Sequence, residues 1–538
     1  MSLRGSGLSR GLTDQVRKLF PIISNSCARS AQVELTYVPR RSTHDTHTAE
    51  LSDGGDRVDT VSASDLGSNE TNVLAALNIE SHVGVLLGAG ASAAAGLPGW
   101  DEFATNLLVV SGSITDKATA QAFLEGQDPA IAAESARRAA GSRWAEVLRE
   151  SLYGPPGEEA VAPSGLHEAA AALVAQRPPG DSLILTLNFD LLLENSLRAV
   201  LDELGSPVQV TTRSSDRPRA ASDDIEVHHL HGSLTESGEG ADSVVLTLSD
   251  YNSIAQVPRP WQVAILQEAL QRGPLILAGT SYRDPDIRQW IHELVSQDSS
   301  AAVVVFLARE GLGLNRERFL EVQAALTAQW SALGVTVLPV QDHADAAQAL
   351  RELPRVHDAG YIPPAERAAR LFARHLDDFD RLQQEHAAEL DADLQRLRTT
   401  FPGLGNLTLW LADGGGRLVR WAANDRIYRL REHLRAIQPG HDSEWIAGQS
   451  LGRNDQLARD IRHPASTARW RSVIATPVVT DLPGGPPFPS AVISAASTGS
   501  LADIEADSLA EEHSALSAKW ATELERIASE ALPEGSHS

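Results

Sequence analysis

Short apolar runs alternate with longer helical patterns between residues 72 and 355, and this alternation constrains the possible folds more than any other feature. The apolar runs lie at 83–87, 183–187, 244–248, 275–278, 303–307 and 335–340, and helical patterns lie at 191–204, 262–271 and 287–295. Strands that are apolar throughout are typical of parallel sheets covered on both faces, because the crossovers between such strands are helices. We therefore expect an α/β fold with a Rossmann-like parallel sheet. Residues 100–177 hold no strand pattern, so we expect a helical insertion there, as a lid or a small subdomain.

The first 70 residues differ in composition from the unit that follows them. One amphipathic helix pattern lies at 12–23, and beyond Pro39 the chain is rich in Ser, Thr, Asp and Gly. Such a composition buries little apolar surface, so we expect residues 1–70 to form a flexible N-terminal extension.

Residues 365–531 follow a Pro- and Gly-containing break and carry a different pattern. A charged helix pattern at 365–397 comes first, and two strand patterns around a glycine turn at 407–423 then predict a hairpin. Further strand patterns lie at 472–479 and 491–496, and an amphipathic helix pattern closes the region at 501–531. We expect a smaller α+β domain flanked by helices.

Charge and cysteine content exclude several function classes. The formal net charge is −25 over 538 residues, whereas binders of duplex nucleic acid present a basic face to the phosphates, so nucleic acid is disfavoured as a substrate or ligand. The only cysteine is Cys27, which excludes an internal disulfide and a zinc site built from several thiolates. No apolar stretch approaches the roughly 20 residues of a membrane-spanning helix, and no signal-peptide core is evident. We expect a cytoplasmic protein that does not engage a membrane.

Glycines follow the first apolar run directly, in the stretch VLLGAGASAAAGLPGW at 85–100. The amides of such a turn, together with the N-terminus of the helix after it, favour a pyrophosphate. Gly88, Gly90 and Ala93 also meet a loose dinucleotide fingerprint. A tight turn in an ordinary α/β core explains the same residues, so this stretch alone leaves both interpretations open.

A histidine, His231, precedes a glycine turn in HHLHGSL, where it is well placed as a general base near neutral pH. Polar residues follow two further strand patterns. They are Asn188 and Asp190 in LTLNFDLLLENSL, and Gly279 and Ser281 in ILAGTSYRDPDI. Ligands of parallel sheets bind at the carboxyl ends of the strands, so these residues are candidates for holding ribose, phosphate or an attacking water. An ordinary structural role is the alternative: a helix N-cap for Asn188, Asp190 or Asp284, and a hydrogen-bonded structural histidine for His231.

In this order, the four segments resemble the sirtuin-like NAD-binding fold over residues 80–345. The stretch GAG-x-S-x-x-x-G-[IL]-P is matched by Gly88, Ala89, Gly90, Ser92, Gly96, Leu97 and Pro98, T-x-N-x-D by Thr186, Asn188 and Asp190, His-Gly by His231 and Gly232, and G-x-S by Gly279 and Ser281. The chain departs from the protein deacylases of that family, because Gly99-Trp100-Asp101 stands where they carry an aromatic-arginine pair, and the four zinc cysteines are missing. It looks instead like the bacterial sirtuin-like effectors that hydrolyse NAD in anti-phage defence.

This resemblance implies an NAD glycohydrolase with NAD as substrate and no zinc. The turn at 88–92, including Ala89, would grip the pyrophosphate, and Gly279 and Ser281 would hold the adenosine side. Asn188 would orient the nicotinamide ribose and the attacking water, His231 would act as the base, and Asp190 would fix the ribose or support the site. Two alternatives stay open: a non-catalytic regulator that senses NAD or ADP-ribose, and a zinc-free protein deacylase or ADP-ribosyltransferase.

Residues 365–531 resemble, more faintly, a GAF-type sensor domain. The resemblance implies that this region senses a trigger, which would be a phage component or a small-molecule signal, and gates the NAD-binding unit. A structural or dimerisation module fits the pattern equally well. The helix pattern at 365–397 could pair with a second copy, and on that basis we expect a homo-oligomer, but a solvated connector explains the same pattern equally well.

Overall fold

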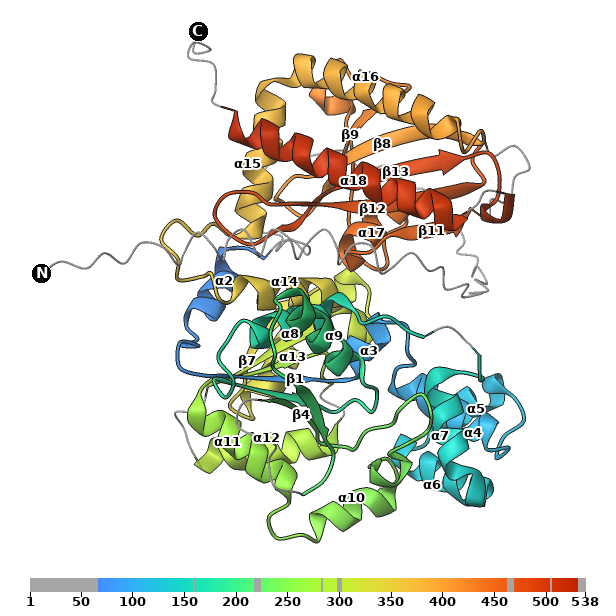
Figure 1. Cartoon of the computed structure of the whole chain (residues 1–538), viewed down its shortest axis with the longest axis vertical. Helices are drawn as coiled ribbons and strands as arrows, with labels where there is room; N and C mark the ends of the chain where they lie inside the picture. The colour runs from blue at the N-terminus through green and yellow to red at the C-terminus, as the bar shows by residue number, and fades with distance from the viewer. Residues whose placement is uncertain are drawn as a thin grey trace, which may run out of the picture.

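The computed structural model describes residues 66–157, 160–216, 224–281, 284–297, 302–461, 469–503 and 506–530. The helix pattern at 12–23 and nearly all of the N-terminal extension lie outside these described residues. Figure 1 shows two stacked units, an α/β unit that carries the first part of the chain and a second unit that carries the last part. Among the described helices, none combines the length and the apolar character needed to cross a bilayer.

Seven parallel strands form the sheet of the first unit, in the order β3-β4-β2-β1-β5-β6-β7 (Figure 1). The strands are β1 (Val83–Leu87), β2 (Ser182–Thr186), β3 (Val210–Arg213), β4 (Ile225–His229), β5 (Leu275–Ala278), β6 (Val303–Ala308) and β7 (Thr336–Val340). Strand β1 is central, pairs with β2 and β5 and is buried along its whole length. The predicted Rossmann-like parallel sheet is confirmed.

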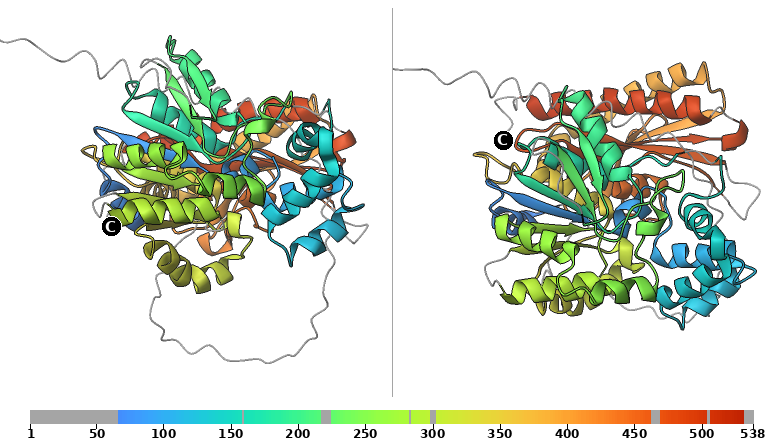
Figure 2. Two further views of the ribbon diagram at one scale, coloured as in Figure 1. Left: turned by 90° about the horizontal axis from the view of Figure 1, so that it is seen from below. Right: turned by 60° about the horizontal axis from the view of Figure 1, so that its bottom comes forward.

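Helices cover both faces of this sheet (Figure 2). One face carries α2 (Ser68–Ala75), α3 (Ala89–Ala94), α8 (Gly165–Ala175), α9 (Leu192–Glu203) and α14 (His343–Glu352), and the other carries α11 (Trp261–Arg272), α12 (Pro285–Gln297) and α13 (Arg316–Ser331). Side chains alternate between the two layers along β1: Val85 and Leu87 join the first core, and Leu86 joins the second. Burial on both sides explains why the strands are apolar throughout.

The insertion forms a helical cluster to one side of the sheet (Figure 1). Its helices are α4 (Trp100–Val110), α5 (Lys117–Leu124), α6 (Pro129–Ala140) and α7 (Trp144–Tyr153), and they share a separate core. Phe189 and Leu192 extend into this core from the segment after β2. The predicted helical character of this region is confirmed, whereas α8 packs in the core of the sheet itself.

In the first unit, one predicted strand is wrong and two of the described strands were not predicted. The run at 244–248 forms a loop and the start of α10 (Leu248–Ala255), because Thr247 and Asp250 build a reciprocal capping box that begins a helix. Strands β3 and β4 pair with each other at the edge of the sheet. Their sequences, VTTR and IEVHH, lack the continuous apolar pattern.

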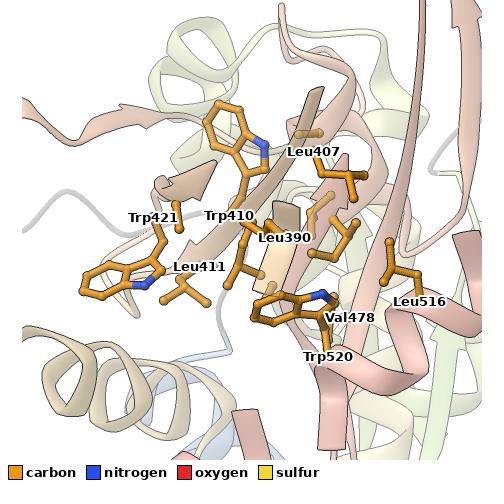
Figure 3. Close-up of a cluster of buried hydrophobic side chains, with 14 of the residues drawn as sticks. Leu390, Leu407, Trp410, Leu411, Trp421, Val478, Leu516 and Trp520 are labelled. Atoms are coloured by element: carbon orange, nitrogen blue, oxygen red, sulfur yellow. The ribbon is translucent and has the colours of Figure 1, made fainter. Parts of the chain in front are cut away.

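The second unit is built on a six-stranded antiparallel sheet in the order β10-β9-β8-β13-β12-β11. The strands are β8 (Leu404–Ala412), β9 (Leu418–Ala423), β10 (Arg435–Ile437), β11 (Leu457–Asp460), β12 (Ser472–Thr480) and β13 (Phe488–Ser497). Helices α15 (Pro364–Asp377), α16 (Phe379–Arg398) and α18 (Ala506–Ser529) contribute to its core, and α17 (Ile446–Arg453) packs on β12 and β13. Figure 3 shows Trp421 and Trp520 among the buried leucines. The predicted smaller α+β unit is confirmed.

The long helix predicted at 365–397 is two helices. The chain breaks at Asp378, whose backbone lies at φ −104° and ψ 34°, so that α15 and α16 run in different directions (Figure 1). Phe379, the first residue of α16, is buried against Trp421 with the ring centroids 5.5 Å apart. The break therefore places an aromatic side chain in the core that a continuous helix would carry elsewhere.

Candidate functional site

A closed hydrogen-bond network joins the end of β2 to the glycine turn after β1. The side-chain amide of Asn188 donates to the carbonyl oxygen of Gly88 at 3.0 Å and to the hydroxyl of Ser92 at 2.7 Å. That hydroxyl donates in turn to Oδ2 of Asp190 at 2.6 Å. Asn188, Asp190 and Ser92 are at most 7% exposed. The structure thus brings together three of the residues singled out in the sequence, and both amide protons of Asn188 are already used.

Asp190 also serves the helix that follows it. Its Oδ1 accepts a hydrogen bond from the amide of Leu192 at 3.1 Å, at the first residue of α9. The N-cap residue of α9 is Leu191, so neither Asn188 nor Asp190 holds the capping position that the sequence left open, although Asp190 accepts from an amide of the first turn while it contacts Ser92. Because both carboxylate oxygens are engaged, Asp190 is held in one orientation between α3 and α9.

The glycine turn packs against the corresponding turn after β5. The amide of Gly90 donates to the carbonyl of Gly279 at 2.8 Å, and a Cβ atom on Gly88 would lie 2.7 Å from that same oxygen. Gly279 has φ +65°, and a Cβ there would lie 2.7 Å from the amide nitrogen of Ala91. The three glycines are thus explained by contact between two turns of the protein.

This packing bears on the predicted pyrophosphate site. The amides of Gly88, Gly90 and Ala91 donate to the carbonyls of Ala278, Gly279 and Gly88 respectively. In this conformation those three amides are not available to a phosphate. His343, at the start of α14, closes the turn from the other side, because a Cβ on Gly90 would lie 2.5 Å from its Cε1. His343 is a neighbour of the turn that the sequence did not reveal.

His231 lies just beyond β4 and faces two carboxylates at the start of α12. Its Nδ1 is 3.9 Å from Oδ2 of Asp284, and its Nε2 is 3.5 Å from Oδ2 of Asp286. Tyr251 and Trp290 pack edge-on against the imidazole, with ring centroids 5.7 and 6.1 Å away. Burial opposes charging of this ring, but the two carboxylates outweigh it and raise the pKa of His231.

The sequence patterns indicated Asp284 but not Asp286. Asp284 caps α12, as its position suggested, with Oδ1 accepting from the amide of Ile287 at 2.9 Å. The same side chain faces His231, which the capping interpretation did not anticipate. Asp286 was missed, and the signal that could have found it is its spacing of two residues from Asp284 in the DPD stretch.

A second histidine, His229, supports the site from below. Its Nδ1 lies 2.9 Å from the backbone oxygen of Asn188, and its Nε2 lies 2.8 Å from Oε1 of Glu194. Glu194 is fully buried and also accepts a 2.6 Å hydrogen bond from the hydroxyl of Thr212. Burial disfavours the charged imidazole, but Glu194 outweighs burial and raises the pKa of His229. His229 thereby fixes the backbone of Asn188 and acts as a positioning residue.

Ser281 lies at the exposed end of the β5 turn. Its carbonyl oxygen accepts from the amide of Asp284 at 3.3 Å, which connects the β5 turn to the carboxylate beside His231. The predicted residues Asn188, His231 and Gly279 therefore follow β2, β4 and β5, and all lie at the carboxyl edge of the sheet.

Among the described residues, one group of side chains is close enough to hold a metal ion. Its members are Glu310, Asp342 and His441, whose ligand atoms lie within 4.8 Å of one another. The group lies after β6 and β7, at the other side of the sheet from His231, and His441 already bonds Asp342 at 2.5 Å. The guanidinium of Arg309 stands 3.4 Å from the same nitrogen of His441, which disfavours a cation there.

Comparison with known proteins bears on the first unit most directly. Residues 182–337 match the family model described as a SIR2-like domain. The match includes Asn188, Asp190, His231, Gly279 and Ser281 and begins after the glycine turn. This match indicates an NAD-related enzymatic function in general. No curated protein matches the chain.

Solved structures similar to part of the chain include GAF-type and reductase proteins. A type II free methionine-R-sulfoxide reductase from Thermoplasma acidophilum is 18% identical, with 27% of this chain and 95% of that chain covered and a TM-score of 0.20. A putative GAF sensor protein from Burkholderia vietnamiensis is 19% identical, with 30% and 92% covered and a TM-score of 0.20. The free methionine-R-sulfoxide reductase of Neisseria meningitidis is 21% identical, with 26% and 80% covered and a TM-score of 0.19.

Proposed function

We propose that the chain is an NAD glycohydrolase that cleaves the bond between nicotinamide and ribose. The observation that carries this proposal is the arrangement at the carboxyl edge of the sheet. Asn188, bonded to Ser92, follows β2, and His231, flanked by two carboxylates, follows the neighbouring strand β4. An amide that orients a ribose, and a supported base after the neighbouring strand, are the groups that hydrolysis of an N-glycosidic bond needs.

The reaction consumes water and releases nicotinamide, ADP-ribose and a proton. The C–N bond to nicotinamide breaks through an oxocarbenium-like state, and a new C–O bond forms from the attacking water. Asn188 would orient the ribose and that water, and His231 would accept the proton. The carboxylates of Asp284 and Asp286 would stabilise the imidazolium that results, while Asp190 holds Ser92 and Asn188 in register.

Binding of NAD requires a local change in the site. Asn188 donates both amide protons within the protein, and the amides of the glycine turn are bonded to carbonyls. We infer that the described conformation is a resting one and that NAD displaces some of these contacts. The pyrophosphate would then lie at the 88–92 turn, with Gly279 and Ser281 on the adenosine side.

The test is release of nicotinamide and ADP-ribose from NAD without any added peptide. Asn188→Ala and His231→Ala should each lower the rate by roughly 10²-fold or more, since positioned acid–base groups contribute on that scale. Asn195→Ala is the matched control, because Asn195 is exposed on α9 and bonds only the exposed Arg198 among the described residues. Full activity in both site variants would contradict the roles proposed for Asn188 and His231.

A second candidate, a regulator that senses NAD or ADP-ribose without turnover, is favoured by the same closed network. A fully satisfied, buried Asn188 is also what a purely structural amide would look like. NAD binding measured by calorimetry with no nicotinamide release would select this candidate. Nicotinamide release that depends on an added acceptor would select a zinc-free deacylase or ADP-ribosyltransferase.

We propose further that the activity depletes NAD in anti-phage defence, in a homo-oligomer that the second unit holds inactive until a phage component or a small molecule triggers it. The proposal rests on the resemblance to the defence effectors and on the second unit packed against the carboxyl edge of the sheet. Cellular NAD should fall during infection of cells that carry the chain and stay constant with Asn188→Ala. Unchanged NAD in both would reject the defence role.

A further inference from the structure

A cavity of about 440 Å³ lies at the junction between the two units. One arginine of the first unit, Arg316 on α13, reaches it, and the segment from β10 to the start of α17 lines the rest with Arg435, Ile437 and Trp445. This volume lies within the range of pockets that bind small molecules. Trp445 is 40% exposed there, which is unusual for a large aromatic side chain.

Two guanidinium groups line the cavity, together with the carboxylates of Asp442 and Glu444. Asp442, which also lines it, is taken by Arg309 through two 2.7 Å contacts. Arg316 donates to the backbone oxygen of Pro439 at 2.7 Å, and Arg435 stacks 4.9 Å from the ring centroid of Trp445. Within the described part of the chain, neither Arg316 nor Arg435 forms an ion pair with a carboxylate. In a chain of net charge −25, two such guanidinium groups at one cavity call for an anion.

Crowding of positive charge points the same way. Burial, and after it the charge of Arg309, lower the pKa of Arg316, and they outweigh the opposite effect of Asp342, Asp442 and Asp345. A bound anion would relieve this repulsion. The apolar surface beside the two arginines comes from Ile437 and Trp445, which suits the organic part of a ligand.

We propose that this cavity binds a small organic phosphate of mononucleotide size. Arg316 and Arg435 hold the phosphate, and Trp445 and Ile437 contact the nucleoside. The site belongs to neither unit alone, because its arginines come from both.

The cavity is connected to the candidate active site through a cluster of four residues, the junction cluster: Arg309, Asp342, His441 and Asp442. Pro439, which Arg316 holds, lies two residues before His441 in the same loop. The amide of His441 donates to Asp342 at 3.1 Å. His343, the residue after Asp342, packs against Gly90 of the glycine turn. Helices α14 and α17 face each other across this junction (Figure 1).

The consequence for activity rests on the proposed NAD glycohydrolase function. A phosphate draws Arg316 away from the oxygen of Pro439 and frees the loop that carries His441 and Asp442. The contacts that hold His343 against the glycine turn then loosen, and NAD enters the site. Ligand binding therefore raises the rate of nicotinamide release.

The experiment is isothermal titration calorimetry of the full chain with AMP, GMP, CMP, UMP and inorganic phosphate, followed by nicotinamide release with each. At least one mononucleotide should bind, and Arg435→Gln and Arg316→Gln should each weaken its binding by about tenfold or more. Arg435 is exposed, so its variant should fold normally. Arg429→Gln is the matched control, since Arg429 is exposed nearby and does not line the cavity.

The outcomes separate the site from the proposed function. Binding that persists in both arginine variants but is lost in Asn188→Ala places the nucleotide in the NAD site and overturns the proposal. The absence of binding by every mononucleotide also overturns it. Binding of inorganic phosphate alone, lost in both variants, supports the anion site and overturns its nucleotide character. Arginine-dependent binding in a chain that never releases nicotinamide upholds the cavity and rejects the glycohydrolase.

Discussion

At the scale of single residues, the side chains of Ser92, Asn188 and Asp190 are held by one buried hydrogen-bond network. Asn188 and Asp190 could be found from the sequence because they follow a predicted strand at the carboxyl edge of a parallel sheet, and His231 because it precedes a glycine turn. His229 and Glu194 could not, because their roles depend on contacts across strands and helices that no local pattern encodes.

The carboxylates beside His231 should set the pH dependence of catalysis. Because Asp284 and Asp286 raise the pKa of His231, the base is free only above that raised value, and kcat/KM should rise with pH from above about 6.5. Asp286→Asn removes one carboxylate, so the rise should move to lower pH. Glu293→Gln, an exposed charge on the same helix, should leave the profile in place. An unshifted profile in Asp286→Asn would contradict the role of His231 as the base.

The buried pair of His229 and Glu194 should stabilise the fold in a limited pH window. Burial would raise the pKa of Glu194, but His229 outweighs it and lowers that pKa, while the pKa of His229 is raised. The stabilisation is therefore complete at about pH 6, is lost as pH rises through the raised pKa of His229, and is lost as pH falls through the lowered pKa of Glu194.

Glu194→Gln should accordingly lower the free energy of unfolding by about 1–3 kcal/mol at pH 6 and by less at pH 9. Urea denaturation at the two pH values measures the difference. Asn195→Ala, on the exposed side of α9, serves as the control, and an effect of Glu194→Gln that does not vary with pH would argue against a charged pair.

At the scale of elements, sequence patterns found the strands of the parallel sheet whose sequences are apolar along most of their length. Strands β1, β2, β5, β6 and β7 were all indicated by apolar runs. Strands β3 and β4 were missed because polar and histidine residues interrupt their pattern. The run at 244–248 was misassigned because a capping box outweighed its β-branched residues. The break at Asp378 has no proline or glycine to announce it.

The contact between the turns after β1 and β5 should be intolerant of any side chain. Gly279→Ala places a Cβ 2.7 Å from the amide of Ala91 at φ +65°, so both strain and overlap oppose it. We expect a loss of about 2–4 kcal/mol in thermal or urea unfolding, together with loss of NAD binding. Gly99→Ala should cost less, about 1 kcal/mol, because no atom beyond its chain neighbours lies within 4 Å of its Cβ position and only the preference of the α4 N-cap for glycine over alanine is lost. Equal stability of the two variants would contradict the packing argument.

At the scale of the whole molecule, the junction is polar and built from paired charges. Arg309 is fully buried, and its carboxylate partner Asp442 belongs to the other unit. A similar pair joins Arg367 of α15 to Glu352 of α14, both buried. No local sequence pattern predicts such pairs, because the partners of each lie far apart in the chain or on different elements.

Asp442→Asn should leave the buried guanidinium of Arg309 without its carboxylate. Because Asp442 is partly exposed, we expect a loss of about 1–3 kcal/mol rather than the full cost of breaking a buried pair. The same variant should raise nicotinamide release without added nucleotide, since it loosens the junction cluster. Glu385→Gln breaks the exposed pair with Arg381 and should change stability by less than about 0.5 kcal/mol and leave activity unaltered.

The paired charges across the junction also restrict how such chains can be recombined. A chimera that keeps the parallel-sheet unit and takes its second unit from a relative inherits Arg309, Asp342 and Glu352 without their counterparts at Asp442, His441 and Arg367. Each mismatch leaves without a partner a charge that is neutralised in the parent chain. Exchange of sensory modules among relatives of this chain must therefore transplant the facing residues together, and those three pairs should co-vary wherever this pairing of units occurs.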